Sequence, residues 1–172
     1  MSRLLLVRHG ETELNSVARY WGSTDVALSA DGIRQAEQLS RRLAAEPIDS
    51  AYTSSQKRAE MTARTIAREH KIEVAACPEL REIDFGQLEG LTYDEIRQQH
   101  PQVARLWEEQ DPRLSYPGGE SLETFDRRLS GFLPRLENFA AGETILIVAH
   151  AGSLRLLICR LLGLDKKHLW QI

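Results

Sequence analysis

The sequence predicts an α/β fold, a three-layer αβα sandwich with a mostly parallel central sheet. Short apolar runs alternate with segments of helical periodicity along much of the chain, which is typical of strand–helix–strand units. Two of these runs, "LLLV" and "ILIVA", are apolar at every position and indicate parallel strands covered on both faces. No repeat and no long linker divides the 172 residues, so we expect a single domain over residues 1–172.

The first half of the chain supplies three predicted strands and two predicted helices. Residues 3–7 form the first strand, and residues 50–55 and 72–77 form the next two. Ser29 is a typical N-cap residue for the first helix, and the second helix runs over about residues 57–70. The residues expected to face inward are Ile33, Ala36, Leu39 and Leu43 in the first helix and Ala59, Ala63, Ile66 and Ala67 in the second.

The second half begins with a change of pattern. Between about residues 84 and 140 the periodicity is helical, so we expect a helical insertion that forms a cap on the α/β core. A strand over residues 144–150 follows, and then an apolar helix that we expect to end at Gly163.

Cationic and imidazole side chains follow the ends of the predicted strands. Arg8 and His9 come directly after the first strand, Arg58 comes shortly after the second, and His150 ends the last one. Ligands of open parallel sheets bind beyond the carboxyl ends of the strands. We therefore expect two histidines and two arginines to converge on one pocket.

This set of residues suits the chemistry of phosphate esters. Guanidinium groups match a tetrahedral oxyanion, and a neutral imidazole can attack phosphorus to form a phosphohistidine. The other imidazole, if protonated, would add positive charge beside the equatorial oxygens. Gly10 would leave room for a phosphate beside the backbone.

An acid must also protonate the leaving oxygen and later activate water, and Glu82 after the third strand is the candidate. Glu79, Asp84 and Glu89 are alternatives close in sequence. Because the attacking histidine must be neutral while the acid is protonated, we expect a lowered histidine pKa, a raised Glu82 pKa, or both.

The motifs of other phosphate-processing enzymes do not occur. The residue six positions after Cys77 is Ile83, so a Cys-x₅-Arg signature is absent there, and the chain has no DxD, no GxxxxGK[ST] and no HExxH. The sequence therefore predicts a histidine nucleophile that needs neither a metal ion nor another cofactor.

Composition limits the remaining classes of function. The chain is 42% hydrophobic and 27% charged with a net charge of −3, and no run of Lys and Arg predicts binding to nucleic acid or to an anionic membrane. No apolar stretch is long enough for a membrane span, and the first apolar run is too short for a signal peptide, so we expect a cytoplasmic protein. Cys77 and Cys159 lack CxxC spacing and are expected to be reduced thiols.

Five segments in order, "LLLVRHGETELN", "TSSQKRAEMTA", "LREIDFGQLEG", "PGGES" and "ILIVAHAG", resemble the histidine phosphatase superfamily, in its phosphoglycerate mutase-like branch. The resemblance covers nearly the whole chain and implies an αβα fold. It implies that His9 is the phosphate-accepting nucleophile and that Glu82 donates and accepts the proton. Arg8, Arg58 and His150 would hold the phosphoryl oxygens.

The resemblance also implies a set of substrate-binding residues. Asn15 matches a position that binds phosphate, although it could instead only cap a turn. The backbone N–H groups of Ala151 and Gly152 would add donors, and Ser23 lies where the family often places a substrate contact. Tyr20, Trp21, Phe85, Trp107 and Tyr116 could form a wall for a planar leaving group, or could simply pack the cap against the core.

The compact chain resembles the small phosphatases of this superfamily, and most of all α-ribazole phosphatases. We therefore expect hydrolysis of α-ribazole 5′-phosphate to α-ribazole, a late step of cobalamin biosynthesis. A broad-specificity phosphatase, a phosphoserine phosphatase, a phosphoglycerate mutase and a non-catalytic phospho-ligand binding module are the alternatives. The expected partner is a small phosphomonoester, and the expected assembly is a monomer or a homodimer. Family members continue past "HLWQI" with another strand or hairpin at the sheet edge, so we expect either a shortened sequence or a missing edge strand.

Overall fold

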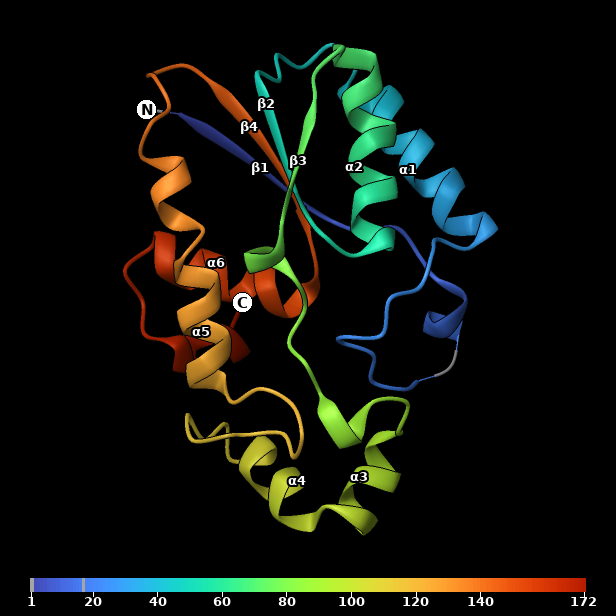
Figure 1. Cartoon of the computed structure of the whole chain (residues 1–172), viewed down its shortest axis with the longest axis vertical. Helices are drawn as coiled ribbons and strands as arrows, with labels where there is room; N and C mark the ends of the chain where they lie inside the picture. Colours follow the sequence, from blue (N-terminus) through green and yellow to red (C-terminus); the bar gives the residue numbers. More distant parts are fainter. Residues whose placement is uncertain (1, 17) are drawn as a thin grey trace.

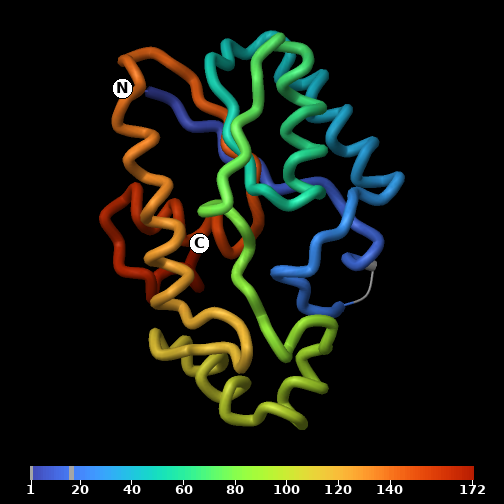
Figure 2. Tube along the Cα trace, in the orientation of Figure 1, coloured from blue at the N-terminus to red at the C-terminus, as the bar shows by residue number. Residues whose placement is uncertain are grey.

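The strands that the structure describes form one parallel sheet. The computed structural model describes residues 2–16 and 18–172. Adjacent strands pair in parallel, in the spatial order β1 (Arg3–Arg8), β4 (Thr144–Ala149), β2 (Ser50–Ser54) and β3 (Val74–Cys77). Figures 1 and 2 show how β1 and β4, far apart in sequence, lie side by side.

Burial of the strands follows their place in the sheet. β4 has a neighbour on each side, and all of its residues are buried. β1 lies at an edge of the sheet, so its residues from Leu4 to Val7 are only half-buried. The sequence had predicted that both faces of this strand would be fully covered. Alternate residues of β4 face different layers: Leu146 and Val148 pack toward one, Ile145 and Ile147 toward the other.

Helices α1 (Ala30–Leu43) and α2 (Lys57–His70) form the first layer (Figure 1). Ala59, Ala63, Ile66 and Ala67 of α2 are buried, as predicted. The prediction for Ile33 is wrong, because this side chain is 41% exposed. The other three predicted residues do face inward: Ala36 is buried, and Leu39 and Leu43 are partly buried against the core. Gly32 and Ser40 are also buried.

The ends of these helices confirm one boundary and move another. The Oγ of Ser29 accepts the N–H of Gly32 at 3.0 Å, so Ser29 caps α1 as predicted. After α2, Lys71 takes a left-handed conformation with φ of 56°, and the N–H of Ile72 donates to the carbonyl of Ala67 at 3.4 Å. Residue 72 therefore belongs to the end of α2, and β3 begins two residues later than predicted.

The second layer contains α5 (Leu122–Ser130) and α6 (Ala151–Leu161). Arg160 of α6 donates to the carboxylate of Asp126 in α5, so α5 belongs to the sandwich although the sequence placed it in the insertion. Helices α3 (Tyr93–Gln99) and α4 (Pro101–Glu108) lie beyond the end of the sheet and make up the cap (Figure 1). Short 3₁₀ segments cover Glu13–Ser16, Pro78–Leu80, Gly86–Leu88, Leu133–Leu136 and Lys166–Trp170.

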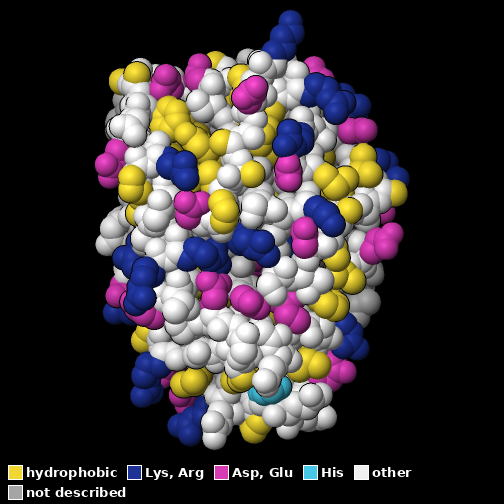
Figure 3. Space-filling model, in the orientation of Figure 1, with side chains coloured by type: hydrophobic (Ala, Val, Ile, Leu, Met, Phe, Trp, Pro, Cys, Tyr) yellow, Lys and Arg dark blue, Asp and Glu magenta, His cyan; other side chains and the backbone are white. Residues whose placement is uncertain are grey.

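The predicted α/β sandwich with a parallel sheet and helices on both faces is confirmed. Helix α6 ends at Leu161, and Gly163 follows with φ of 68°, the left-handed conformation expected just past a helix end. Cationic and anionic side chains alternate over the face seen in Figure 3. Among the described residues, no helix combines the length and the apolar composition needed to cross a membrane.

Candidate active site

The two predicted histidines meet where β1 and β4 end. The backbone N–H of His9 donates to the carbonyl of Ala149 at 3.0 Å, which extends the pairing of the two strands by one residue. The imidazole ring of His9 and that of His150 lie 5.0 Å apart between centroids. The strand ends thus bring together residues 141 positions apart, as the sheet topology predicted.

His9 presents one free ring nitrogen. Its Nδ1 lies 2.7 Å from the carbonyl oxygen of Gly10. A carbonyl can only accept, so Nδ1 carries the proton and Nε2 keeps its lone pair. Burial lowers the pKa of His9 to about 4; the bond to Gly10 opposes this shift, and the charges of Arg58 and Arg8 reinforce it. His9 is therefore a neutral imidazole with the lone pair that a nucleophile needs.

Arg58 is buried, with 3% of its surface exposed, and is held by backbone carbonyls. It donates to the oxygen of Thr24 at 2.7 Å and to the oxygen of Gly22 at 2.9 Å, and its Nε donates to Nδ1 of His150 at 3.2 Å. Two of its five N–H groups have no partner among the described residues and remain available to an oxyanion.

His150 is neutral in this arrangement, which differs from the protonated form considered from sequence. Because Arg58 always donates, Nδ1 of His150 must accept, and the proton lies on Nε2, 2.8 Å from Oγ of Ser54. Burial, followed by the charges of Arg58 and His9, holds the pKa of His150 well below its usual value. Both of its nitrogens are occupied, so a contact with a phosphoryl oxygen would require one of these bonds to exchange.

Arg8 and Asn15 carry free donors beside His9. Arg8 is exposed and makes no hydrogen bond or ion pair with a described residue. Oδ1 of Asn15 accepts the N–H and the hydroxyl of Thr12, at 2.8 and 2.9 Å, which leaves the two N–H groups of its amide without a described partner. Asn15 therefore caps a turn, and its amide can also donate to an anion.

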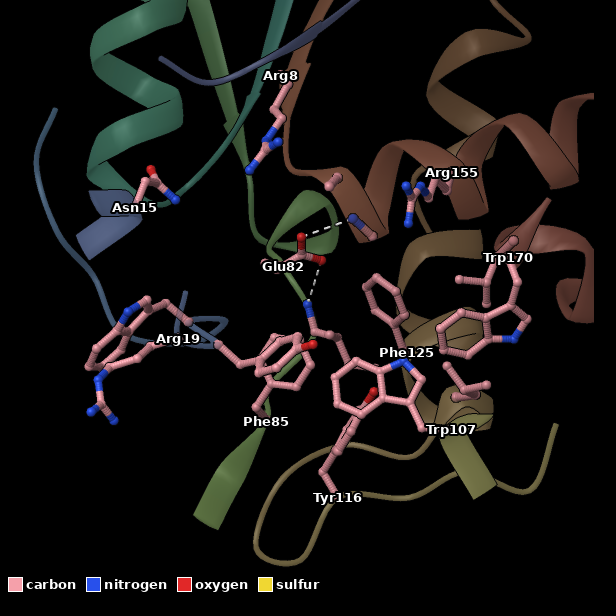
Figure 4. A pocket seen from close by; sticks show the side chains of 17 residues that line it. Arg8, Asn15, Arg19, Glu82, Phe85, Trp107, Tyr116, Phe125, Arg155 and Trp170 are labelled. Atoms are coloured by element: carbon pink, nitrogen blue, oxygen red, sulfur yellow. Dashed lines mark hydrogen bonds between the residues drawn. The ribbon is translucent and has the colours of Figure 1, made fainter. Parts of the chain in front are cut away.

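The carboxyl group of Glu82 is fixed by two backbone N–H groups. Its Oε2 accepts from Gly152 at 2.9 Å, and its Oε1 accepts from Ile83 at 3.0 Å (Figure 4). Burial raises the pKa of Glu82, although these bonds and the charge of Arg58 oppose the shift. Both pKa shifts expected from the sequence are therefore present, lowered for His9 and raised for Glu82.

The three neighbouring carboxylates have other partners. The carboxylate of Glu79 pairs with Arg135, and that of Asp84 accepts the N–H of Gly86 at 2.9 Å. The carboxylate of Glu89 accepts the N–H groups of residues 22, 23 and 24 at 2.8, 2.9 and 3.2 Å. Of the four candidates, Glu82 is the one that lines the cavity described below.

Glu89 also determines the position of Ser23. By accepting three successive N–H groups, it holds the loop over Arg58 and aims the carbonyls of Gly22 and Thr24 at that guanidinium. Ser23 lines neither the cavity nor the pocket around His9, so the structure does not place it as a substrate contact.

The glycines and the start of α6 act differently from the sequence-based expectation. A Cβ at Gly10 would lie 2.5 Å from the carbonyl oxygen of Gly32, so this glycine allows close packing on α1, and it also lines the polar pocket that contains His9. The N–H of Gly152 is taken by Glu82. Ala151 also lines the cavity, and its N–H has no described partner, so it is the free donor of the predicted pair.

An aromatic cavity of about 290 Å³ adjoins these residues, a size at the lower end for small-molecule sites. Arg8 and Asn15 line both this cavity and the polar pocket that contains His9, so the two spaces adjoin. Glu82 lies in the cavity on the side next to Arg8 (Figure 4). A phosphate beside His9 would therefore have its alcohol part in the aromatic cavity, past Glu82.

The aromatic wall expected from the sequence is present. Tyr20, Trp21, Phe85, Trp107 and Tyr116 all line the cavity. The rings of Phe85 and Trp107 are stacked with centroids 6.0 Å apart, and Tyr20 lies 4.7 Å from Trp107. These rings contact one another and also face the cavity, so packing and lining are not exclusive alternatives.

Sequence reasoning missed several residues of the site. Ser54 ends β2 and Gln56 follows two residues later, so both lie at the carboxyl end of the strand, the signal that had identified Arg58. Gln56 is fully buried, donates to the carbonyl of Gly22 at 2.7 Å and accepts the N–H of Glu82 at 3.0 Å. The cavity residues Phe125, Arg155 and Trp170 carried no comparable signal. Within residues 2–16 and 18–172, no group of three or more His, Cys, Asp and Glu side chains could hold a metal ion.

Comparison with known proteins decides the family. The model of the histidine phosphatase superfamily (branch 1) matches residues 4–172. The chain belongs to this superfamily. Phosphoserine phosphatase 1 of Hydrogenobacter thermophilus is 36% identical to it, over 99% of this chain and 81% of that protein. The adenosylcobalamin/alpha-ribazole phosphatase of Escherichia coli is 34% identical, over 98% of this chain and 83% of that protein.

A solved structure of this superfamily agrees with the fold. The alpha-ribazole phosphatase of Shigella flexneri superposes with a TM-score of 0.89 and 34% identity, over 99% of this chain and 84% of that one. Family and relatives together identify the chain as a phosphatase, an enzyme of the hydrolase class that takes a small phosphate-bearing substrate.

Proposed function

We propose that this phosphatase hydrolyses a phosphomonoester through a phosphohistidine on His9. Nε2 of His9 attacks phosphorus, the ester P–O bond breaks, and the leaving oxygen takes the proton of Glu82. Glu82, now a carboxylate, takes a proton from water; the water oxygen attacks phosphorus, the P–N bond breaks, and inorganic phosphate leaves. The site returns to neutral His9 and protonated Glu82, so the cycle balances.

The remaining polar groups would hold the phosphoryl oxygens. Arg8 has all its donors free, Arg58 has two N–H groups free, and the amide of Asn15 and the N–H of Ala151 have no described partner. Oriented donors of this kind stabilise the charge of the transferring group. In this proposal His150 mainly orients Arg58, because both of its nitrogens are already bonded.

The aromatic cavity beside Glu82 carries the choice of substrate. Its volume of about 290 Å³ and its wall of aromatic rings suit a planar leaving group. We propose α-ribazole 5′-phosphate, whose benzimidazole would lie among the rings, with α-ribazole as the product in cobalamin biosynthesis. The relatives from Escherichia coli and Shigella flexneri are named for this activity.

Phosphoserine is the second candidate, because a relative named for that activity is 36% identical over nearly the whole chain. Its small leaving group would leave most of the cavity unfilled. A mutase would return the phosphoryl group to the substrate, and a binding module would form no phosphohistidine. Isomerisation of 3-phosphoglycerate faster than its hydrolysis would establish the mutase.

The test is phosphate release from α-ribazole 5′-phosphate and from phosphoserine, for the wild type and for His9→Ala. We expect the first substrate to have the higher kcat/KM, no effect of EDTA, and loss of activity in the variant. His168→Ala, which removes a histidine outside the cavity, is the matched control and should retain activity. Full activity of His9→Ala, or loss of wild-type activity with EDTA, would refute the mechanism.

We further propose that residues 1–172 act as one domain, in the cytoplasm, as a monomer or a homodimer. Light scattering on the purified protein would measure the assembly, and a mass above that of a dimer would contradict it.

A further inference from the structure

Arg155 is a cation in the cavity that the proposed chemistry does not use. It lies in α6, one helical turn after Ala151, and both residues line the cavity. Its side chain is exposed and makes no hydrogen bond or ion pair with a described residue. In Figure 4 both arginines lie above Glu82, Arg8 to its left and Arg155 to its right.

The third arginine of the cavity differs from Arg155. Arg19 donates to the carbonyl of Gly90 at 2.5 Å and to the carboxylate of Glu95 at 2.8 Å. Its charge is therefore neutralised, and its guanidinium points away from Glu82 (Figure 4). Among the described residues, Arg8 and Arg155 are the cavity arginines whose donors remain free.

Arg155 has no hydrogen-bond or ion-pair partner among the described residues that line the cavity. Glu82 is the one carboxylate among the described lining residues, and both of its oxygens already accept backbone N–H groups. Phe125, Leu169 and Trp170 line the same space and have no acceptor at their ring or methyl surfaces. An oxygen acceptor brought in by a ligand would therefore find a guanidinium whose donors no described residue occupies, in a partly apolar setting.

The ligand group that meets Arg155 is distinct from the reacting phosphate. The phosphate must lie beside Nε2 of His9, in the pocket lined by Arg8 and Asn15, to which Arg155 does not belong. We propose that Arg155 is a specificity-determining residue that binds an oxygen acceptor on the alcohol part of the substrate. This proposal rests on the proposed phosphatase function, and it names a substrate class: phosphomonoesters whose alcohol carries a hydroxyl or carboxylate besides the ester oxygen.

Two pairs of substrates separate the two sources of such an oxygen. Adenosine 5′-monophosphate and its 2′,3′-dideoxy analogue differ in sugar hydroxyls. Phosphoserine and phosphoethanolamine differ in a carboxylate. In the wild type we expect the oxygen-bearing member of at least one pair to have the higher kcat/KM.

The decisive variant is Arg155→Met, which keeps an unbranched side chain and removes the donors. We expect it to lower kcat/KM about ten- to hundredfold for the oxygen-bearing member of the responsive pair, the usual range for a charge-assisted hydrogen bond. The kcat/KM for the member that lacks the oxygen should change less than about threefold. Arg155→Lys should recover part of the preference, and Arg42→Met, an exposed arginine of α1 outside the cavity, should match the wild type.

Binding can be measured without turnover by placing both forms of residue 155 in a His9→Ala background, in which the esters are not hydrolysed. All three tryptophans, Trp21, Trp107 and Trp170, line the cavity, so their fluorescence reports its occupancy. The Kd of each ester should show the same pattern, with the loss in Arg155→Met confined to the oxygen-bearing member. If Arg155→Met loses affinity equally for both members of each pair, or for neither member, the proposal is overturned. Absence of phosphate release in the wild type would instead count against the phosphatase function, because the Kd comparison remains valid.

Discussion

The lowered pKa of His9 predicts that the enzyme stays active in acid where an ordinary histidine would be protonated. The perturbation is acidification from pH 7 to pH 4. With a pKa of about 4, His9 keeps about 90% of its neutral form at pH 5, whereas a histidine with a pKa of 6.5 would keep about 3%. The attacking form is therefore about thirty times more abundant at pH 5 than it would be without burial and the nearby arginines.

Glu82 sets the other limit of the pH profile. Its raised pKa means that the acid form persists above the ordinary carboxyl value of 4.5 and is lost as the pH rises further. Activity requires neutral His9 and protonated Glu82, so kcat/KM should rise through about pH 4 and fall again as the pH passes the raised pKa of Glu82. Glu82→Gln should lower kcat about a hundredfold or more for alcohol leaving groups and remove the falling limb.

The assay combines kcat/KM, which reports the ionisation of the free enzyme, with a direct titration. NMR of ¹³C-labelled histidine follows each imidazole, with His9→Gln assigning one of the five. We expect the His9 signal to move near pH 4 and the acid limb of kcat/KM to coincide with it. A His9 titration between pH 6 and 7 would refute the reasoning, because burial and two arginines would then have failed to disfavour the imidazolium.

Three further substitutions test how the site is held. In Gly152→Ala, the new Cβ would lie 2.4 Å from Oε1 of Glu82, so the carboxyl must move and kcat should fall at least about tenfold, while an unchanged kcat and pH profile would contradict this geometry. Ser54→Ala removes the acceptor of Nε2–H of His150 and should lower the free energy of unfolding in urea by about 1–3 kcal/mol; equal unfolding midpoints would show that the bond does not matter. Trp107→Ala opens the aromatic wall and should raise KM for an aromatic phosphomonoester severalfold but leave KM for phosphoserine unchanged, and equal changes would argue against a role in recognition.

The convergence of the site could be predicted from sequence because it follows from topology. Parallel strands place their carboxyl ends at one edge, so residues that follow different strands must meet there, however distant they are in the chain. His9 and His150 met for this reason, and Arg58 came with β2. The rule places side chains but does not orient them, so it could not foresee that Arg58 would occupy one nitrogen of His150 and Ser54 the other.

One prediction of a buried residue was wrong, at Ile33 in helix α1. The apolar spacing selected Ile33 and Ala36, but of these two only Ala36 is buried, together with the small residues Gly32 and Ser40. Small residues allow the close approach of two helices and carry almost no hydrophobic signal, so periodicity alone selects the larger side chain. The hydrogen bond from Gly152 to Glu82 could not be predicted from sequence either, because every residue except proline carries a backbone N–H group and the residue type does not reveal its partner.

That bond changes the role of the start of α6. Sequence reasoning assigned its N–H groups to the substrate phosphate, yet the N–H of Gly152 donates to the acid itself. Burial disfavours the charged form of Glu82 before reaction, and the N–H groups of Gly152 and Ile83 favour it. In the proposed reaction these donors stabilise the charge that forms on the carboxyl as its proton passes to the leaving oxygen, without reorganisation at that moment. The same helix therefore supplies one donor to the acid, leaves the N–H of Ala151 for the phosphate, and carries Arg155 to the alcohol part of the substrate.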